Sequence, residues 1–139
     1  MSLTHLHPML VHFPIALALV AFLFNIVSYF LKKEWLRSSS VALTVLATLG
    51  AIAALLSGFF FTKPVAGLAA TMKVEHITYG VASTILLFIA AIIGLVWMRD
   101  KKGGAKVGYL YTLFMLLAAI GISLTGMVGG SIVYDVWLF

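Results

Sequence analysis

The sequence contains no cysteine, which excludes disulfide bonds, iron–sulfur clusters, thiolate metal sites and covalently attached c-type haem. It is also poor in charge, because Asp, Glu, Lys and Arg make up 9% of its 139 residues, against roughly a quarter in a soluble domain. No nucleophile–base pair, paired carboxylates or phosphate loop appears, so the sequence leans away from an enzyme. Any cofactor must be held by histidine, methionine, carboxylate or shape alone.

Apolar residues are abundant instead. They make up 63% of the chain, and the mean hydropathy is +1.17. So many apolar side chains cannot all be buried inside so short a chain, and the remainder must face lipid. The apolar runs have the roughly 20 residues needed to cross a bilayer, and they cover residues 13–31, 40–61, 76–98 and 107–128. We predict an all-α membrane protein, a four-helix up-down transmembrane bundle forming one domain over residues 1–139.

The net charge of +5 lies in the polar breaks between these runs, forms no basic face and does not indicate a nucleic-acid partner. Seven basic residues fall between the first and second or the third and fourth runs: Lys32, Lys33, Arg37, Arg99, Lys101, Lys102 and Lys106. The opposite side has only Lys63 and Lys73. Because Lys and Arg accumulate on the cytoplasmic side, we expect a multi-pass protein of the bacterial inner membrane with both termini outside.

Small residues recur at helical spacing and predict the faces that point inward, since they let helix backbones approach closely in lipid. The stripes include Ala18, Ala21, Gly50, Ala54, Gly58, Gly80, Ser83, Ala90, Gly94, Ala118, Gly121, Thr125 and Gly129. Asn25 lies near mid-membrane, where we expect its amide to bond a neighbouring helix. Small-residue stripes on outer faces also make a homodimer an expected form.

All four histidines fall at the predicted outer end: His5, His7, His12 and His76. Two of them can be placed in depth by counting back from polar or aromatic residues near the cytoplasmic edge. His12 precedes Lys32, and His76 precedes Trp97, by about 20 residues in each case, which at about 1.5 Å per residue places both about 30 Å above that edge. His12 and His76 are therefore predicted to be level.

Glycines occur at the same height on the other two helices, namely Gly58 and Gly126. Two histidines level with two glycine openings is what a flat, bulky cofactor inside a bundle needs. On an ideal helix, however, His7 rather than His12 shares a face with Ala18 and Ala21. Pro14 is expected to kink the helix and could turn His12 inward, so both histidines remain candidates.

The opening His7-Pro8-Met9-Leu10-Val11-His12-Phe13-Pro14-Ile15-Ala16 resembles the signature of a bacterial membrane family, the domain of unknown function twenty-two thirty-one. His76 at the start of the third run also resembles that family. So does the ending Thr125-Gly126-Met127-Val128-Gly129-Gly130-Ser131-Ile132-Val133-Tyr134, although Ser131 stands where the family often has an acid. The resemblance covers essentially the whole chain. Some relatives carry a Rieske iron–sulfur domain on the same chain, which implies redox work.

Three functions follow as hypotheses. The first is a membrane electron carrier with a b-type haem, ligated by His12 and His76 with His7 as the substitute for His12, and with a periplasmic redox partner or a quinone. Three glycines, Gly58, Gly126 and Gly129, are assigned to this cofactor site. The second is a copper or zinc protein that uses His7, His12 and His76, with methionines for copper(I) at Met9, Met72 and Met127. The third is a structural or assembly partner without a cofactor.

Overall fold

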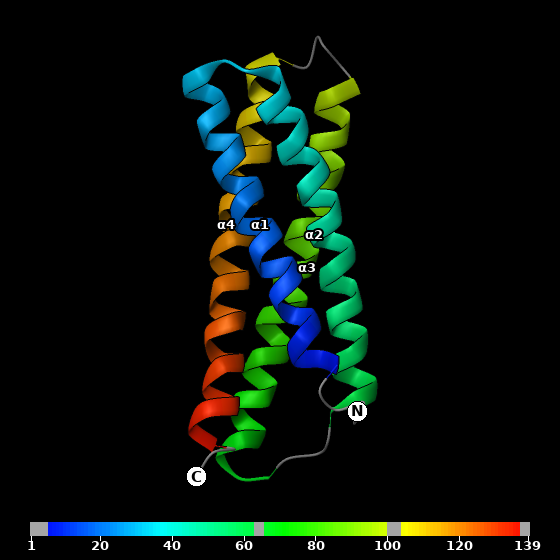
Figure 1. Ribbon diagram of the computed structural model, residues 1–139, viewed down its shortest axis with the longest axis vertical. Helices are drawn as coiled ribbons and strands as arrows, with labels where there is room; N and C mark the ends of the chain where they lie inside the picture. Colours follow the sequence, from blue (N-terminus) through cyan, green and yellow to red (C-terminus); the bar gives the residue numbers. More distant parts are fainter. Residues whose placement is uncertain (1–5, 63–65, 100–103, 137–139) are drawn as a thin grey trace.

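The computed structural model describes residues 6–62, 66–99 and 104–136 of the chain. Within these ranges four long α-helices are followed by a short π-helix (Figure 1). The elements are α1 (Leu6–Leu31), α2 (Glu34–Phe61), α3 (Leu68–Arg99), α4 (Gly104–Ser131) and η2 (Ile132–Val136). All four α-helices are long and apolar enough to cross a membrane, so the predicted all-α transmembrane class is confirmed.

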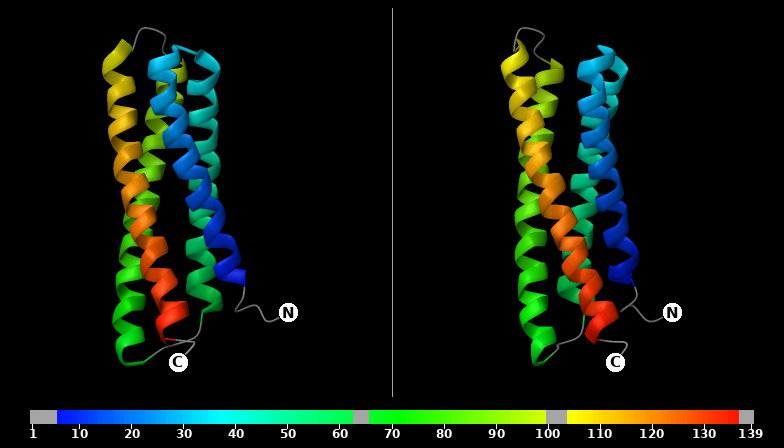
Figure 2. Two further views of the ribbon diagram at one scale, coloured as in Figure 1. Left: turned by 60° about the vertical axis from the view of Figure 1, so that its left-hand side comes forward. Right: turned by 90° about the vertical axis from the view of Figure 1, so that its left-hand side faces the viewer.

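The helices alternate in direction and pack as an up-down bundle (Figures 1 and 2). The most extensive packing joins α1 to α2 and α3 to α4, so the chain forms two helical hairpins. The hairpins meet where α2 contacts α3 and α1 contacts α4, and this arrangement puts α1 and α3 on one diagonal of the bundle. Side chains on α1 and α3 that lie at one height can therefore meet across the interior.

The two ends of the bundle differ in charge. At one end, where α1 and α3 finish, the described basic residues are Lys32, Lys33, Arg37, Arg99 and Lys106. We call this the basic end. At the other end, where α1 begins and α4 finishes, the described basic residue is Lys73. We call this the terminal end. His5, Lys63, Lys101 and Lys102 lie outside the described residues.

The helices begin earlier than the apolar runs that predicted them. The runs start at residues 13, 40, 76 and 107, whereas the helices start at Leu6, Glu34, Leu68 and Gly104. Their last residues differ from the predicted ones by three at most. Hydropathy marks only the part of a helix inside hydrocarbon, and the backbone hydrogen-bond ladder continues beyond it through the interface.

Small side chains fill the interior, as the stripes predicted. Ala18, Ala21, Ala47, Ala90 and Ala118 are fully buried, whereas most of the large apolar side chains point outward. Such an outward apolar surface suits lipid, which solvates hydrocarbon as well as the protein core does.

Polar side chains cross-link the helices in the half nearer the basic end, which we call the basic half. The Tyr111 hydroxyl of α4 lies 2.8 Å from Ser40 Oγ and 2.7 Å from Thr44 Oγ1 on α2. On α1, Asn25 donates from Nδ2 to Thr112 Oγ1 of α4 at 2.7 Å, which confirms the expected interhelical bond. Because lipid drives helices together weakly, these bonds and the close packing around them hold the two hairpins in register.

Candidate functional site

Two half-buried histidine rings meet inside the other half of the bundle, which we call the terminal half. His7 near the start of α1 and His76 on α3 have ring centroids 5.9 Å apart, with ring planes at 86°. The diagonal placement of α1 and α3 makes this possible. His7 is separated from Leu31, the last residue of α1, by almost the same length of helix that separates His76 from Arg99, the last residue of α3. The two histidines therefore stand level when depth is measured from the true helix ends.

His12 stays outside this pair. Its side chain is exposed at the rim, and its Nδ1 lies 2.6 Å from the Pro8 carbonyl oxygen of the same helix. The α-helix continues through Pro14, so the expected inward turn of His12 does not occur. His7 instead shares the buried face of α1 with Ala18, which decides the alternative left open by the sequence.

Hydrogen bonds fix the orientation of both imidazoles. His76 Nδ1 lies 2.9 Å from the Thr125 carbonyl oxygen of α4. His7 Nδ1 lies 3.0 Å from the Ala54 carbonyl oxygen and 2.9 Å from Ser57 Oγ on α2. The Ser57 hydroxyl itself donates to the Ala54 carbonyl at 2.7 Å. A carbonyl oxygen can only accept, so each Nδ1 carries a proton, and in the neutral imidazole each Nε2 then keeps its lone pair.

Two glycines seat these rings. A Cβ at Gly58 would lie 3.0 Å from His7 Cε1, and a Cβ at Gly129 would lie 2.8 Å from His76 Cε1. Both glycines therefore make room for an imidazole, whereas the sequence assigned Gly58 by its height, and Gly129 with it, to a site for the edges of a cofactor. Gly126 does not touch either ring; a Cβ there would lie 3.1 Å from Ile15 Cδ1.

A cavity of about 510 Å³ adjoins the pair, within the size range typical of small-molecule sites. All four helices and η2 line it, mostly with apolar side chains. It extends from Thr62, Lys73 and Tyr134 near the terminal end to Ser83 and Ile122 deeper in the bundle. The cavity gathers the predicted cofactor residues in one place, because its lining includes His7, His12, His76, Gly58, Gly126 and Gly129.

Lys73 also lines the cavity, although the sequence pattern marked it only as a topology signal. Its spacing was the available clue. Lys73 precedes His76 by three residues on α3, and residues three apart share a helix face. A cation one turn nearer the terminal end than a candidate ligand therefore faces the same interior space.

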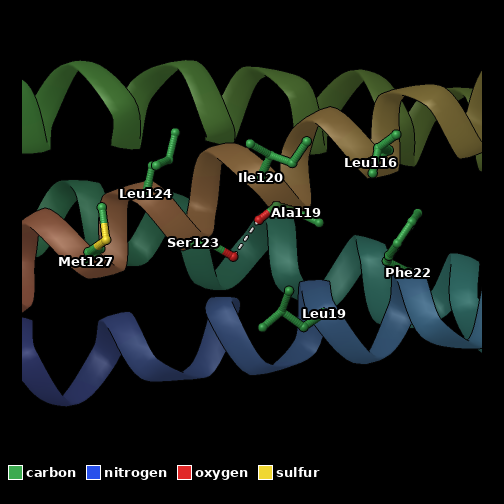
Figure 3. Close-up of a pocket in the computed structure, with 8 residues that line it drawn as sticks. All are labelled: Leu19, Phe22, Leu116, Ala119, Ile120, Ser123, Leu124 and Met127. Atoms are coloured by element: carbon green, nitrogen blue, oxygen red, sulfur yellow. Dashed lines mark hydrogen bonds between the residues drawn. The ribbon is translucent and has the colours of Figure 1, made fainter.

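The methionines do not join the histidines. Met9 and Met127 are each 65% exposed, and none of Met9, Met72 and Met127 lines the cavity. Met127 lines a different, shallow groove between α1 and α4, together with apolar side chains such as Leu19 and Leu124 (Figure 3). Among residues 6–62, 66–99 and 104–136, no three His, Asp or Glu side chains come together as a metal-binding group.

The family model described as "Predicted membrane protein (DUF2231)" matches residues 4–138, which is almost the whole chain. The chain belongs to this family. No curated protein and no solved structure shows a significant match to the chain. Membership establishes that the chain is a membrane protein, and the description of the family assigns it no activity.

Proposed function

We propose that the protein binds one haem b in the cavity of the terminal half, where His7 and His76 would hold it, and carries electrons near the outer face of a bacterial inner membrane. The observation that supports this most is the pair of interior imidazoles, each with Nδ1 bonded to a backbone carbonyl and Nε2 left as an acceptor. Metal-ligating histidines almost always have their second nitrogen held in this way.

The separation of the rings fits a shared metal ion. Metal–imidazole bonds of about 2.0–2.1 Å each, plus the inner halves of two rings, give a centroid separation of about 6 Å. The observed separation is 5.9 Å. The adjoining cavity supplies apolar walls for a macrocycle. The residues present therefore fit the group on spacing, donor chemistry and room.

A haem held by two imidazoles supplies a one-electron couple with no open coordination position, which favours electron transfer over oxygen chemistry. The residues of this chain do the rest. Thr125, Ala54 and Ser57 orient the two rings, and Gly58 and Gly129 let them reach the interior. Apolar walls exclude water and lower the local dielectric, which tunes a reduction potential. A periplasmic protein or a quinone is the partner that this position suits.

The orientation is part of the proposal. In the sequence, seven of the nine basic residues fall between the first and second or the third and fourth apolar runs, which the positive-inside rule assigns to the cytoplasm. The cavity and both chain ends then face the periplasm. A reporter fused after Phe139 that is active only in the periplasm is expected to be active; a cytoplasmic fusion would reverse the orientation. Homodimer formation stays a prediction, and mass photometry in mild detergent would test it.

A bare copper or zinc ion is the second candidate, because the same ring separation suits any ion that two imidazoles hold. Of the three predicted histidine ligands, the structure brings together His7 and His76, while His12 is turned to the rim. A metal protein would therefore have to complete its coordination with water or a partner's side chain.

Absorbance of protein purified from haem-replete cells tests the proposal. The parent is expected to show a Soret band, and His7→Ala and His76→Ala are expected to lose it. His12→Ala should keep it, because the His12 ring, although it also lines the cavity, is exposed and stays outside the pair of facing imidazoles. A parent without a Soret band that contains stoichiometric copper or zinc would replace haem by the metal site. A parent with neither would favour a structural partner.

A further inference from the structure

The Arg37 side chain, near the start of α2, is held against α3 at the basic end. It is half-buried, and its guanidinium carbon lies 4.3 Å from the centroid of the Trp97 ring. Trp97 is itself buried and packed against Tyr111 and Gly108, so the surface under the guanidinium is held in place. A cation stacked in this way is attracted by the face of the ring, and the contact fixes the plane of the guanidinium.

The stacking does not use the N–H donors of Arg37. These donors lie in the guanidinium plane and point away from its edges, whereas the ring contacts its face. The Nε atom is buried without a hydrogen-bond partner, and in the part of the chain that the structure describes Arg37 forms no hydrogen bond or ion pair, not even with Glu34 one turn before it. A half-buried guanidinium without an acceptor from its own chain is placed for an acceptor from outside, which would bond at the Nη edge because Nε is buried.

Exposed aromatic side chains mark the level of the membrane interface at this end. Trp35 on α2 is 61% exposed and Tyr109 on α4 is 64% exposed, as amphipathic rings are in the headgroup layer. Arg37 follows Trp35 by two residues, which places it about 3 Å deeper along α2. Further along, α2 and α3 carry exposed apolar side chains such as Leu46 and Leu95. These surroundings suit a molecule with an acidic head at Arg37 and hydrocarbon chains beyond it.

The charge of the basic end favours a headgroup with a net negative charge. The other described basic residues there are all exposed: Lys32, Lys33, Arg99 and Lys106. In the sequence, the stretches between the first and second and between the third and fourth apolar runs carry seven basic residues against two acids, Glu34 and Asp100, of which Asp100 lies outside the described residues. Basic clusters beside transmembrane helices attract anionic lipid headgroups through this excess.

We propose that Arg37, stacked on Trp97, binds the phosphate of an anionic phospholipid at the boundary between α2 and α3. A planar guanidinium can bond two phosphate oxygens at once, and the basic surroundings select an anionic headgroup over a zwitterionic one. The site lies in the basic half, so the proposal goes beyond the haem site and does not depend on it. Free phosphate shares the head chemistry but lacks the chains that the apolar surfaces of α2 and α3 suit.

Native mass spectrometry of the detergent-purified protein tests the proposal. Dioleoylphosphatidylglycerol and dioleoylphosphatidylcholine are each titrated into the parent, Arg37→Gln and Lys106→Gln. The parent is expected to bind phosphatidylglycerol about tenfold more tightly, and Arg37→Gln is expected to lose this preference with the charge-assisted bond. Lys106→Gln is the matched control. It removes one exposed positive charge from the same end, on the helix diagonal to α2, and should stay within about twofold of the parent.

Equal losses in Arg37→Gln and Lys106→Gln would overturn the proposal, because only the general charge of the basic end would then act. A parent without a preference for phosphatidylglycerol would overturn it as well. Glycerol 3-phosphate, added as a competitor, separates the two sources: displacement of the lipid at equal concentration would assign the site to a free phosphate and overturn the lipid, whereas retention of the lipid supports it.

Arg37→Lys covers the case in which Arg37→Gln does not fold. It keeps the positive charge beside Trp97 but lacks the planar fork, so it is expected to lose most of the preference for phosphatidylglycerol. A folded Arg37→Lys protein with the full preference of the parent would overturn the role given to the guanidinium.

Discussion

In both halves of the bundle, glycines make room for aromatic or imidazole rings, but the rings serve different purposes. In the basic half, glycines bring large aromatic rings against neighbouring helices: a Cβ at Gly108 would lie 2.6 Å from Trp97, and one at Gly94 would lie 2.9 Å from Tyr111. In the terminal half, Gly58 and Gly129 bring imidazoles inward. The larger rings fill the interior of the basic half, whereas the smaller rings adjoin a cavity of about 510 Å³.

The halves also differ in how their polar atoms are used. The Tyr111 hydroxyl has two hydroxyl neighbours from α2, and Trp97 lies under Arg37, whose guanidinium carbon is 4.3 Å from the ring centroid. In the terminal half each imidazole bonds through one nitrogen only, by the contacts found among the described residues. Bonds that close the basic half serve assembly, and the nitrogen left over in the terminal half is available for a ligand.

This contrast suggests a division of labour. The basic half ties the two hairpins together through Asn25, Thr112, Tyr111 and Ser40. The terminal half can then contain a cavity while the two hairpins remain associated. Substitutions in the two halves should therefore separate stability from ligand binding.

The largest effect on stability is expected from Gly108→Ala. The new Cβ would lie 2.6 Å from Trp97 Cζ2, and Trp97 is confined by Tyr111 and Arg37. Overpacking of this kind costs about 1–3 kcal/mol of unfolding free energy. The measurement is reversible unfolding by sodium dodecyl sulfate in mixed micelles, followed by circular dichroism.

Gly80→Ala is the matched control, because the added Cβ would lie at ordinary contact distances, 3.5 Å from Leu55 and 3.6 Å from Thr125. A glycine-to-alanine change in a helix with room for the methyl group is neutral or stabilising by up to about 1 kcal/mol. Equal destabilisation by the two variants would contradict the close packing of Trp97 on Gly108.

Gly129→Ala should weaken haem binding and leave the unfolding free energy almost unchanged, the reverse of Gly108→Ala. The methyl group would lie 2.8 Å from His76 Cε1 and must displace a ring that is held by the Thr125 carbonyl. Misplacing a ligand through its support typically lowers affinity about 10–100-fold, so haem titration should show a loss in this range with little change in unfolding. Gly130→Ala is the comparison, because Gly130 also lines the cavity but a Cβ there would have no protein neighbour within 4 Å. Matching losses at both positions would refute the seating of His76.

A smaller effect on stability is expected from Tyr111→Phe. The change removes a buried hydroxyl that contacts Ser40 and Thr44, but those two keep donating to the carbonyls of Ala21 and Ser40. The cost should be about 1 kcal/mol of unfolding free energy, with unchanged haem affinity. An altered haem affinity would show that the two halves are coupled.

Much of this organisation was predictable from the residues. Hydropathy located the four helices, and the histidines predicted to be level, His12 and His76, lie on the two helices whose histidines do meet, although His7 rather than His12 faces His76. The choice between His7 and His12 was not predictable, because depth was counted from Lys32 and Trp97, near but not at the helix ends. An error of a few residues moves a side chain by several ångströms and onto another helix face. Nor could spacing show that Gly58 would seat a ring, since that depends on the distance between helices.

The smallest effect is expected from Ser57→Ala, which compares the two imidazoles with each other. His7 Nδ1 has two acceptors, the Ser57 hydroxyl at 2.9 Å and the Ala54 carbonyl at 3.0 Å, whereas His76 Nδ1 has the Thr125 carbonyl at 2.9 Å. Removing the hydroxyl leaves His7 the same single support that His76 already has, so haem affinity should fall only about twofold to threefold, below the 10–100-fold typical of losing a sole partner. Ser123→Ala is the control, because the Ser123 hydroxyl donates to the Ala119 carbonyl of its own helix and faces the shallow groove (Figure 3). A loss as complete as that of His7→Ala would mean that the hydroxyl, rather than the carbonyl, sets the orientation of His7.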